Sequence, residues 1–247
     1  MNLSNFYDLS YSDLSDFISS NFSLEKKKTS MRTNQIWKFV YKKGLKETSK
    51  FSNISSELKD NMEKSFNFNR TNIAEKKISK DGTIKWLLKL SDNNLVETVF
   101  IPSGKRGTLC VSSQVGCTLN CKFCHTGTQL MVKNLTTHEI INQILVAKDE
   151  LNDWGSQKKI TNIVYMGMGE PFYNYDNVKK SISILRERNG LDYSPKKITV
   201  STAGISNEIM KAADEIGTYL ALSLHAPTDE LREKIMPINK KFKIKDL

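Results

Sequence analysis

The chain has 247 residues, of which 37 are lysine or arginine and 27 are aspartate or glutamate, so its formal net charge is +10. A hydrophobic fraction of 38% with 26% charged residues excludes a disordered tail and a membrane-embedded protein, since no apolar run approaches roughly 20 residues. The N-terminus lacks the basic and apolar regions of a signal peptide, so we expect no membrane association and a cytoplasmic location. The length predicts one or two domains, and the positive charge favours a polyanionic partner.

The first predicted helices are basic on their outer face. Residues 25–50 contain nine Lys and Arg residues and two Glu residues, a local balance of +7. Apolar side chains between Ile36 and Tyr41 recur with a helical period, which predicts a helix with a buried aromatic face. Its basic face suits either a solubilised surface or phosphate binding, and the pattern alone does not decide between them. A second short amphipathic helix is predicted over residues 51–66.

The next predicted elements are strands. Residues 74–79 and 83–90 flank an Asp-Gly pair, which tolerates the positive φ of a tight turn, so we expect a β-hairpin there. Residues 95–101 have the pattern of a third strand. We therefore predict a first domain over residues 1–100, a small helical module followed by a short β extension.

From about residue 107 onward, predicted strands and helices alternate. The predicted strands are residues 108–112, 159–166, 196–201 and 218–223. The predicted helices are residues 136–152, 175–188, 206–216 and 228–234. Alternation of this kind predicts an α/β fold with a parallel sheet and outer helices, forming a second domain over residues 101–247.

All four cysteines lie between Cys110 and Cys124. Cys117, Cys121 and Cys124 have the spacing C-x3-C-x2-C, and three such thiolates can bind three irons of a cubane cluster and leave the fourth iron open. Structural zinc is the alternative, and it needs a fourth ligand, for which Cys110 or His125 is available. The spacing favours the cluster, because His125 directly follows Cys124. A disulfide framework is not expected in a cytoplasmic chain of this size.

Three polar segments directly follow predicted strands. They are residues 167–171 (GMGEP), 201–204 (STAG) and 223–226 (SLHA). Ligands bind at the carboxyl ends of parallel strands, and glycine lets the backbone approach them closely. Glu170 can accept hydrogen bonds from an ammonium group. Ser201, Ser223 and His225 can contact a carboxylate or a ribose.

Taken together, these motifs resemble those of a known family. The stretch IPSGKRGTLCVSSQVGCTLNCKFCHTGTQ, with NLTTHEI, GMGEPFYN, STAGI and LALSLHAPTDELREKIMPINKKF, is similar to the RlmN family. That family consists of radical S-adenosylmethionine (SAM) methyltransferases that act on adenine C2 in 23S rRNA and in tRNA. The resemblance runs from about Arg32 to the last residue. It implies a partial (β/α) radical SAM barrel, incomplete here, preceded by the N-terminal helical module and β extension.

The resemblance also implies roles for individual residues. Cys117, Cys121 and Cys124 correspond to the ligands of a [4Fe-4S] cluster. The family's SAM contacts correspond to Gly169, Glu170, Ser201, Ser223, Leu224 and His225. Glu97 corresponds to the proton acceptor, and Cys110 to a resolving cysteine that releases the product through a transient disulfide. The implied partners are rRNA, tRNA and an electron donor such as a flavodoxin-type reductase system.

The family's chemistry needs one further cysteine. In the family, one SAM methylates a cysteine near the C-terminus, and a second SAM is cleaved reductively to a radical that takes hydrogen from that methyl group. The resulting carbon radical adds to adenine C2, a position that is not nucleophilic enough for ordinary transfer from SAM. The target base must leave its stack to reach such a site.

This chain departs from the family because no cysteine follows Cys124. The family's methyl-carrying cysteine and its late SAM-contacting asparagine have no counterpart, so we expect a C-terminally truncated member with about four of six βα units. Three hypotheses stay open: an enzyme, truncated or completed by a second chain; an inactive RNA-binding fragment; and a structural zinc protein. Within the enzyme class, adenine-C8 methylation of the Cfr type is the alternative to C2.

Overall fold

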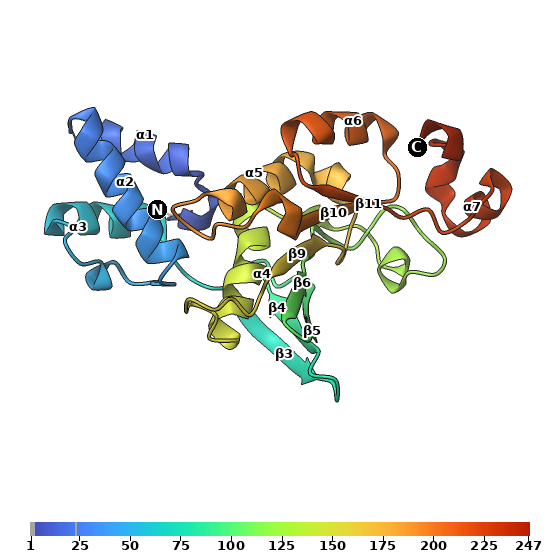
Figure 1. Ribbon diagram of the computed structural model, residues 1–247, viewed down its shortest axis with the longest axis horizontal. Helices are drawn as coiled ribbons and strands as arrows, with labels where there is room; N and C mark the ends of the chain where they lie inside the picture. The colour runs from blue at the N-terminus through green and yellow to red at the C-terminus, as the bar shows by residue number, and fades with distance from the viewer. Residues whose placement is uncertain (1–2, 23) are drawn as a thin grey trace.

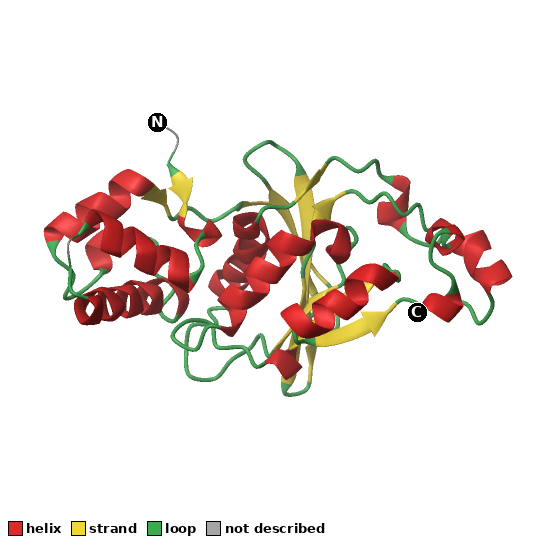
Figure 2. Ribbon diagram, turned by 90° about the horizontal axis from the view of Figure 1, so that it is seen from above, coloured by secondary structure: helices red, strands yellow, loops and turns green. Residues whose placement is uncertain are grey.

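The computed structural model describes residues 3–22 and 24–247. Helices of the N-terminal region gather at one end of the molecule, a β-sheet occupies the middle, and the C-terminal helices lie at the opposite end (Figures 1 and 2). The sheet has seven strands and mixed directions, and within the described residues it stays open rather than closing into a barrel. The predicted α/β class is therefore confirmed.

The N-terminal end consists of helices α1 (Tyr11–Asn21), α2 (Lys26–Tyr41) and α3 (Ser56–Ser65). The predicted buried aromatic face is confirmed in the second half of α2, where Trp37 packs 4.5 Å from Tyr41 between ring centroids and both are buried. The second predicted helix begins later than expected, at α3, because the Ser55 hydroxyl accepts a hydrogen bond from the Leu58 amide and caps the helix there.

The middle of the chain forms four antiparallel strands, β3 (Asn72–Ile78), β4 (Ile84–Lys89), β5 (Leu95–Ser103) and β6 (Arg106–Cys110). The predicted hairpin and third strand are confirmed as β3, β4 and β5. The hairpin turns at Gly82, whose φ is +83°. The predicted boundary after residue 100 lies inside β5, which pairs with β4 on one side and β6 on the other.

The remaining strands run parallel to β6. They are β9 (Asn162–Tyr165), β10 (Ile198–Thr202) and β11 (Tyr219–Leu222), and the sheet order is β11-β10-β9-β6-β5-β4-β3. The helices between and after them are α4 (Thr137–Glu150), α5 (Tyr175–Arg186), α6 (Ser206–Glu215) and α7 (Asp229–Ile235). The predicted parallel alternation is confirmed. The Thr136 side chain caps α4 and forms a capping box with Glu139.

Two predicted strands are shorter or displaced because side chains take their backbone amides. The strand expected from residue 159 begins at Asn162, since the Lys159 and Ile160 amides donate to the Asp153 carboxylate. The strand expected to reach residue 112 ends at Cys110, and the Ser112 amide donates to Gln143 Oε1 of α4 at 2.8 Å.

The short elements lie mostly between these larger ones. The short strands are β1 (Ser4–Asn5), β2 (Phe66–Asn67), β7 (Gln114–Val115) and β8 (Lys133–Asn134). The 3-10 helices are η1 (Phe6–Asp8), η2 (Thr48–Lys50), η3 (His125–Thr128), η4 (Pro171–Asn174), η5 (Pro195–Lys197), η6 (Pro237–Lys240) and η7 (Ile244–Asp246).

The two faces of the seven-stranded sheet differ in burial. On one face Leu109, Ile163 and Val200 are buried and share a core with α4 and α5. On the other face, which we call the open face, side chains in register along one row remain partly exposed. That row consists of Val99, Cys110, Val164, Thr199 and Tyr219. Toward the carboxyl ends of the parallel strands, the open face continues into the site described below.

Within the described residues, no helix combines the length and apolarity that a membrane crossing requires.

Candidate active site

A cleft of about 300 Å³ lies at the carboxyl ends of β9, β10 and β11, and we call it the thiol cleft. Its lining includes the candidate residues Cys117, Cys121, Cys124, Gly169, Glu170, Ser201, Ser223 and His225. The fold thus brings together the cysteine loop and all three strand-end motifs. Leu224, Cys110 and Glu97 do not line the cleft.

The cysteine loop is folded against the C-terminal segment. Cys117, Cys121 and Cys124 pack with Leu119, Ala203 and Met236 in a small apolar cluster separate from the main core. The Lys122 amide donates to the Ile235 carbonyl at 2.9 Å, which anchors the loop to the end of α7. The three thiols are therefore held together in an apolar environment.

Burial controls the acidity of these thiols. Burial, together with the neighbouring thiols Cys117 and Cys124 and the Glu170 carboxylate, raises the pKa of Cys121 to about 11, and the charge of Arg232 partly opposes the increase. The pKa of Cys117 is raised mainly by burial as well. All four cysteines of the chain are free of disulfides. A positively charged occupant would stabilise the thiolates that this environment disfavours.

The donor set fits a cluster with three cysteine ligands. Among the described residues, no three His, Cys, Asp or Glu side chains come close enough together to hold a single ion. A cubane cluster instead takes each thiolate on a different iron, and three thiols around one cleft supply that set. The two residues considered as a fourth zinc ligand, His125 and Cys110, do not line the cleft.

Glu170 joins two of the strand-end motifs. Its Oε1 accepts a hydrogen bond from the Phe172 amide at 3.1 Å, and its Oε2 accepts one from the Ala203 amide at 2.7 Å. The side chain is buried, and burial raises the pKa of Glu170, although these hydrogen bonds partly offset the increase. The carboxylate therefore holds the 167–171 segment against the 201–204 segment.

Gly169 is required by the close approach of Gln114. Its φ is +94°, and a Cβ atom at this position would lie 2.4 Å from Gln114 Cβ. Gln114 Oε1 accepts a hydrogen bond from the Glu170 amide at 2.8 Å, so the contact also orients Glu170. Sequence reasoning missed Gln114, since a glutamine three residues before the first cluster cysteine carries no distinctive signal.

The remaining wall of the cleft contains hydroxyl groups and an imidazole. Ser201 Oγ lies 3.3 Å from Ser223 Oγ across the β10–β11 pair. His225 has a positive φ of 58°, and its ring lies 4.5 Å from the Phe123 ring, measured between centroids. The imidazole is thereby packed onto the cysteine loop. These groups can bind a polar ligand placed beside the three thiols.

Arg232 of α7 is a buried residue that sequence reasoning missed. Its Nε donates to the Leu224 carbonyl at 3.0 Å, its Nη1 to Asn239 Oδ1 at 2.8 Å, and its Nη2 to the Ala203 carbonyl. It is fully buried, and no ion pair neutralises it among the described residues. Burial lowers its pKa. One guanidinium therefore fixes both the 201–204 and the 223–226 segments. In the sequence alone, Arg232 looks like the other charged residues of α7, which is why its role could not be predicted.

Cys110 and Glu97 lie on the open face beside the thiol cleft. Cys110 pairs with Val99 of β5, and Glu97 lies two residues before Val99, so both side chains are on the same face. Burial raises the pKa of Cys110 to about 11, partly opposed by the amide of Met166. Glu97 is half-exposed and forms an ion pair with Lys85 at 2.8 Å.

Comparisons with known proteins place these features in a family context. Residues 111–246 match the family model of the Radical SAM superfamily. The chain is 46% identical over 245 residues to "Dual-specificity RNA methyltransferase RlmN" of Chelativorans sp. (strain BNC1), covering 92% of this chain and 60% of that protein. It is 47% identical over 234 residues to the protein of the same name from Sinorhizobium fredii, covering 88% and 57%.

A solved structure gives the same picture for the fold. It is described as "Crystal Structure of a radical SAM methyltransferase from Sphaerobacter thermophilus" and superimposes with a TM-score of 0.88 at 32% identity. The match covers 99% of this chain and 70% of that one. Against the curated relatives named above, the chain spans about 60% of their length.

Proposed function

Because this chain belongs to the Radical SAM superfamily, we propose that it acts in the SAM-dependent methylation of adenine in RNA. The predicted resemblance to RlmN and the radical SAM fold class are confirmed by the relatives and by the structural neighbour. The observation that carries the proposal is the thiol cleft, in which three cysteines and three strand-end motifs share one site.

We propose that Cys117, Cys121 and Cys124 hold a [4Fe-4S] cluster. Their packing in one apolar cluster, with no disulfide among them, supports this role. When bound, such a cluster supplies one-electron reduction of SAM. The chain contributes the thiolates, the apolar packing by Leu119 and Met236 that limits solvent access, and the nearby buried charge of Arg232.

SAM would lie between the thiols and the strand-end motifs. The Ser201 and Ser223 hydroxyls and the His225 imidazole supply polar contacts, and Gly169 permits close backbone approach. Both carboxylate oxygens of Glu170 already accept backbone hydrogen bonds, so its main contribution is to orient the two loops. It can still accept from an ammonium group with its remaining lone pairs. Leu224 contributes through its carbonyl, which Arg232 holds in place.

We assign the proton-transfer and thiol roles to the open face. Glu97 and Cys110 share that face next to the cleft. This position supports a role for Glu97 as a proton acceptor near the thiol of Cys110. The thiol of Cys110 is kept protonated by burial, so any nucleophilic reaction of this thiol first requires transfer of its proton to a base. Glu97 is a candidate for that proton transfer once its ion pair with Lys85 opens.

The finer features of the proposal concern partners. We propose rRNA and tRNA as substrates, adenine C2 as the methylated position, a flavodoxin-type reductase system as the electron donor and the cytoplasm as the location. The names of the relatives support RNA methylation, and the net charge of +10 suits a polyanion.

The test is anaerobic reconstitution followed by two assays. Production of 5′-deoxyadenosine from SAM with a chemical reductant tests the part of the reaction whose residues are in the thiol cleft. Nucleoside mass spectrometry of incubated rRNA and tRNA tests methyl transfer and separates 2-methyladenosine from 8-methyladenosine. A chain fully loaded with iron and sulfide that leaves SAM intact contradicts the proposal.

A further inference from the structure

A second and larger cleft lies between the β1–η1 segment, the segment that enters β3, the β4–β5 turn and the start of α4. Its volume is about 910 Å³, within the range of small-molecule sites. We call it the asparagine cleft because six asparagines line it: Asn5, Asn67, Asn69, Asn72, Asn93 and Asn142. These residues come from the N-terminus, the segment entering β3, the β4–β5 turn and the second turn of α4. None of them belongs to the thiol cleft.

Two buried polar atoms on its wall have no partner. Asn142 is 1% exposed, and its Oδ1 makes no hydrogen bond with any described residue. Arg70 donates from Nε to Asp149 at 3.0 Å and from Nη1 to the Tyr7 hydroxyl, but its buried Nη2 has no partner. A buried polar group left unpaired costs about 1–3 kcal/mol, so folded proteins keep few of them. An acceptor and a donor left free on one cleft wall point to a ligand.

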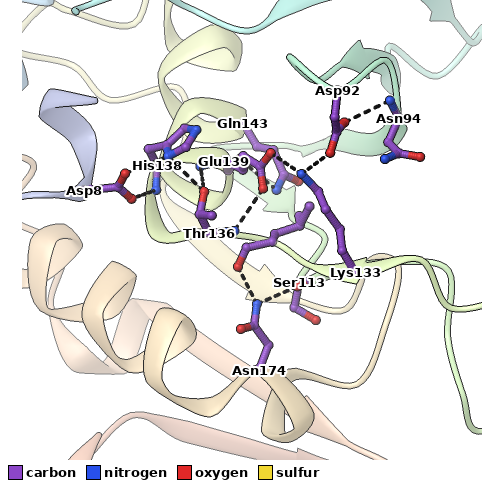
Figure 3. Close-up of polar contacts among 11 residues, drawn as sticks. Asp8, Asp92, Asn94, Ser113, Lys133, Thr136, His138, Glu139, Gln143 and Asn174 are labelled. Carbon is purple, nitrogen blue, oxygen red and sulfur yellow. Dashed lines mark hydrogen bonds and ion pairs between the residues drawn. The ribbon is translucent and has the colours of Figure 1, made fainter. Parts of the chain in front are cut away.

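The acidic groups of the same wall are already paired, and among its cations only Lys89 at the rim has no ion pair with a described residue. Asp8 contacts the His138 ring at 2.8 Å and also accepts from the His138 amide. Glu139 is buried and forms an ion pair with Lys133 at 2.7 Å. Figure 3 shows which side chains make this contact. Asn5 donates to Asn67 at 3.2 Å, and Asn67 donates to the Leu3 carbonyl. The remaining free groups are mainly the carboxamides of Asn69, Asn72, Asn93 and Asn142. A ligand that matches them is uncharged at the contact and carries donors and acceptors along one edge.

The edge of a nucleobase has that chemistry. Asparagine pairs with base edges through its adjacent donor and acceptor, and proteins read splayed bases of single-stranded RNA in this way. The exposed Lys89 at the rim can meet a phosphate of the same strand. The base would satisfy the two orphan atoms.

We propose that the asparagine cleft binds an unpaired nucleotide of an RNA strand, away from the base that is methylated. This inference rests on the proposed function for the identity of the polymer. A nucleotide held here would orient the strand relative to the end of β6, since α4 joins the two: Asn142 lines the cleft, and the adjacent Gln143 accepts from the Ser112 amide, two residues after Cys110.

The test compares Asn142→Ala with Asn94→Ala in the full chain. Asn94 lies in the same β4–β5 turn as Asn93 but does not line the cleft, so it is a matched control. Binding of a fluorescein-labelled, mixed-sequence single-stranded RNA is measured by anisotropy, and thermal melting is measured without RNA. We expect Asn142→Ala to weaken RNA binding about tenfold, the loss of one base-edge pair, and Asn94→Ala to leave it unchanged.

The melting temperature separates ligand binding from structural support. Removing an unsatisfied buried acceptor should leave the unliganded protein at least as stable, whereas a structural asparagine would destabilise it on removal. A lower melting temperature for Asn142→Ala, or RNA affinity equal to that of the unmodified chain, overturns the inference. Asn69 also lines the cleft but is exposed, so Asn69→Ala should weaken RNA binding without destabilising the core.

Two further readouts locate the site and identify the ligand source. Ultraviolet cross-linking of the unmodified chain to the same RNA should place nucleotides on peptides containing residues 67–72, 89–93 or 138–142. Cross-links only elsewhere overturn the cleft assignment while RNA binding itself persists. If adenosine monophosphate competes as well as the RNA strand does, the ligand is a free nucleotide, and the assignment of an RNA strand is wrong. A chain that binds no RNA removes both this inference and the proposed substrate class.

Discussion

The thiol cleft and the asparagine cleft differ in how the chain builds them. The thiol cleft collects one short cysteine loop and the segments that directly follow successive parallel strands, so its chemistry is grouped in contiguous motifs. The asparagine cleft collects single residues from four segments that are as far apart as Asn5 and Asn142. The first can be recognised in the sequence, and the second exists only after the N-terminal segment packs beside α4 and the β4–β5 turn.

The largest expected effect is on the iron and sulfide content of the thiol cleft, which should distinguish Cys121 from Cys110. Replacement Cys121→Ala should reduce the iron and sulfide of the reconstituted chain from about four each per chain to near zero, since a thiolate ligand is lost. Cys110→Ala, at a residue outside the thiol cleft, should keep the full content. Colorimetric iron and sulfide analysis with absorption spectra measures both.

The same analysis distinguishes the alternatives for the metal. Zinc in place of iron in the unmodified chain would favour a structural zinc site. Equal metal loss in the Cys110→Ala and Cys121→Ala variants would place Cys110 among the ligands, contrary to the arrangement of the thiol cleft.

The second prediction concerns the residue that holds the thiol cleft together. Arg232→Leu should lower the free energy of unfolding by about 3 kcal/mol, because the Leu224 and Ala203 carbonyls and Asn239 lose a shared donor. Urea denaturation measures the change. Lys234→Leu is the control, since its ion pair with Glu230 is exposed and contributes at most about 0.5 kcal/mol. Equal effects in the two variants would show that Arg232 is not a central support.

The third prediction tests the close packing behind Glu170. Gly169→Ala should destabilise the chain by about 2 kcal/mol, because the new methyl group meets Gln114 and the positive φ is strained. Gly217→Ala is a matched control: it has a φ of +62° but no atom within 4 Å of the added Cβ. The control isolates backbone strain, about 1 kcal/mol, from the steric contact. Chemical denaturation that gives equal losses would contradict the contact.

The smallest expected effect lies in the asparagine cleft. Burial alone would raise the pKa of Asp8, but the hydrogen bonds and charge of His138 outweigh it, so the folded-state pKa is lowered. The ionised carboxylate therefore stabilises the fold above the unfolded pKa of about 4, and this stability is lost as the pH falls through the lowered folded pKa.

Asp8→Asn should accordingly flatten the decline of stability below about pH 4, by roughly 0.5 kcal/mol because the pair is partly exposed. Denaturation at several pH values, combined with His138→Gln in a double-mutant cycle, measures the coupling. An unchanged acid slope in Asp8→Asn would show that the pair does not connect η1 to α4 energetically.

Features of contiguous motifs could be predicted from the sequence, and features that depend on distant residues could not. The sequence predicted the βα order and the three polar segments at the carboxyl ends of the strands, because these depend on local periodicity and on the common direction of parallel strands. It did not predict Arg232 or Gln114, whose partners are distant in the chain, nor the early ends of β6 and β9, where Gln143 and Asp153 take backbone amides. Asn142 carries no signal at all before the cleft is formed.

Arg232 has an electronic consequence beyond its hydrogen bonds. It carries a positive charge that is buried, has no carboxylate ion pair and acts on Cys121 in the direction that favours negative charge. The same field favours an additional electron on any group that the three thiolates hold, since reduction makes such a group more negative. The guanidinium that organises the loops thereby makes the site a better electron acceptor, and its removal would shift the reduction potential of that group to more negative values.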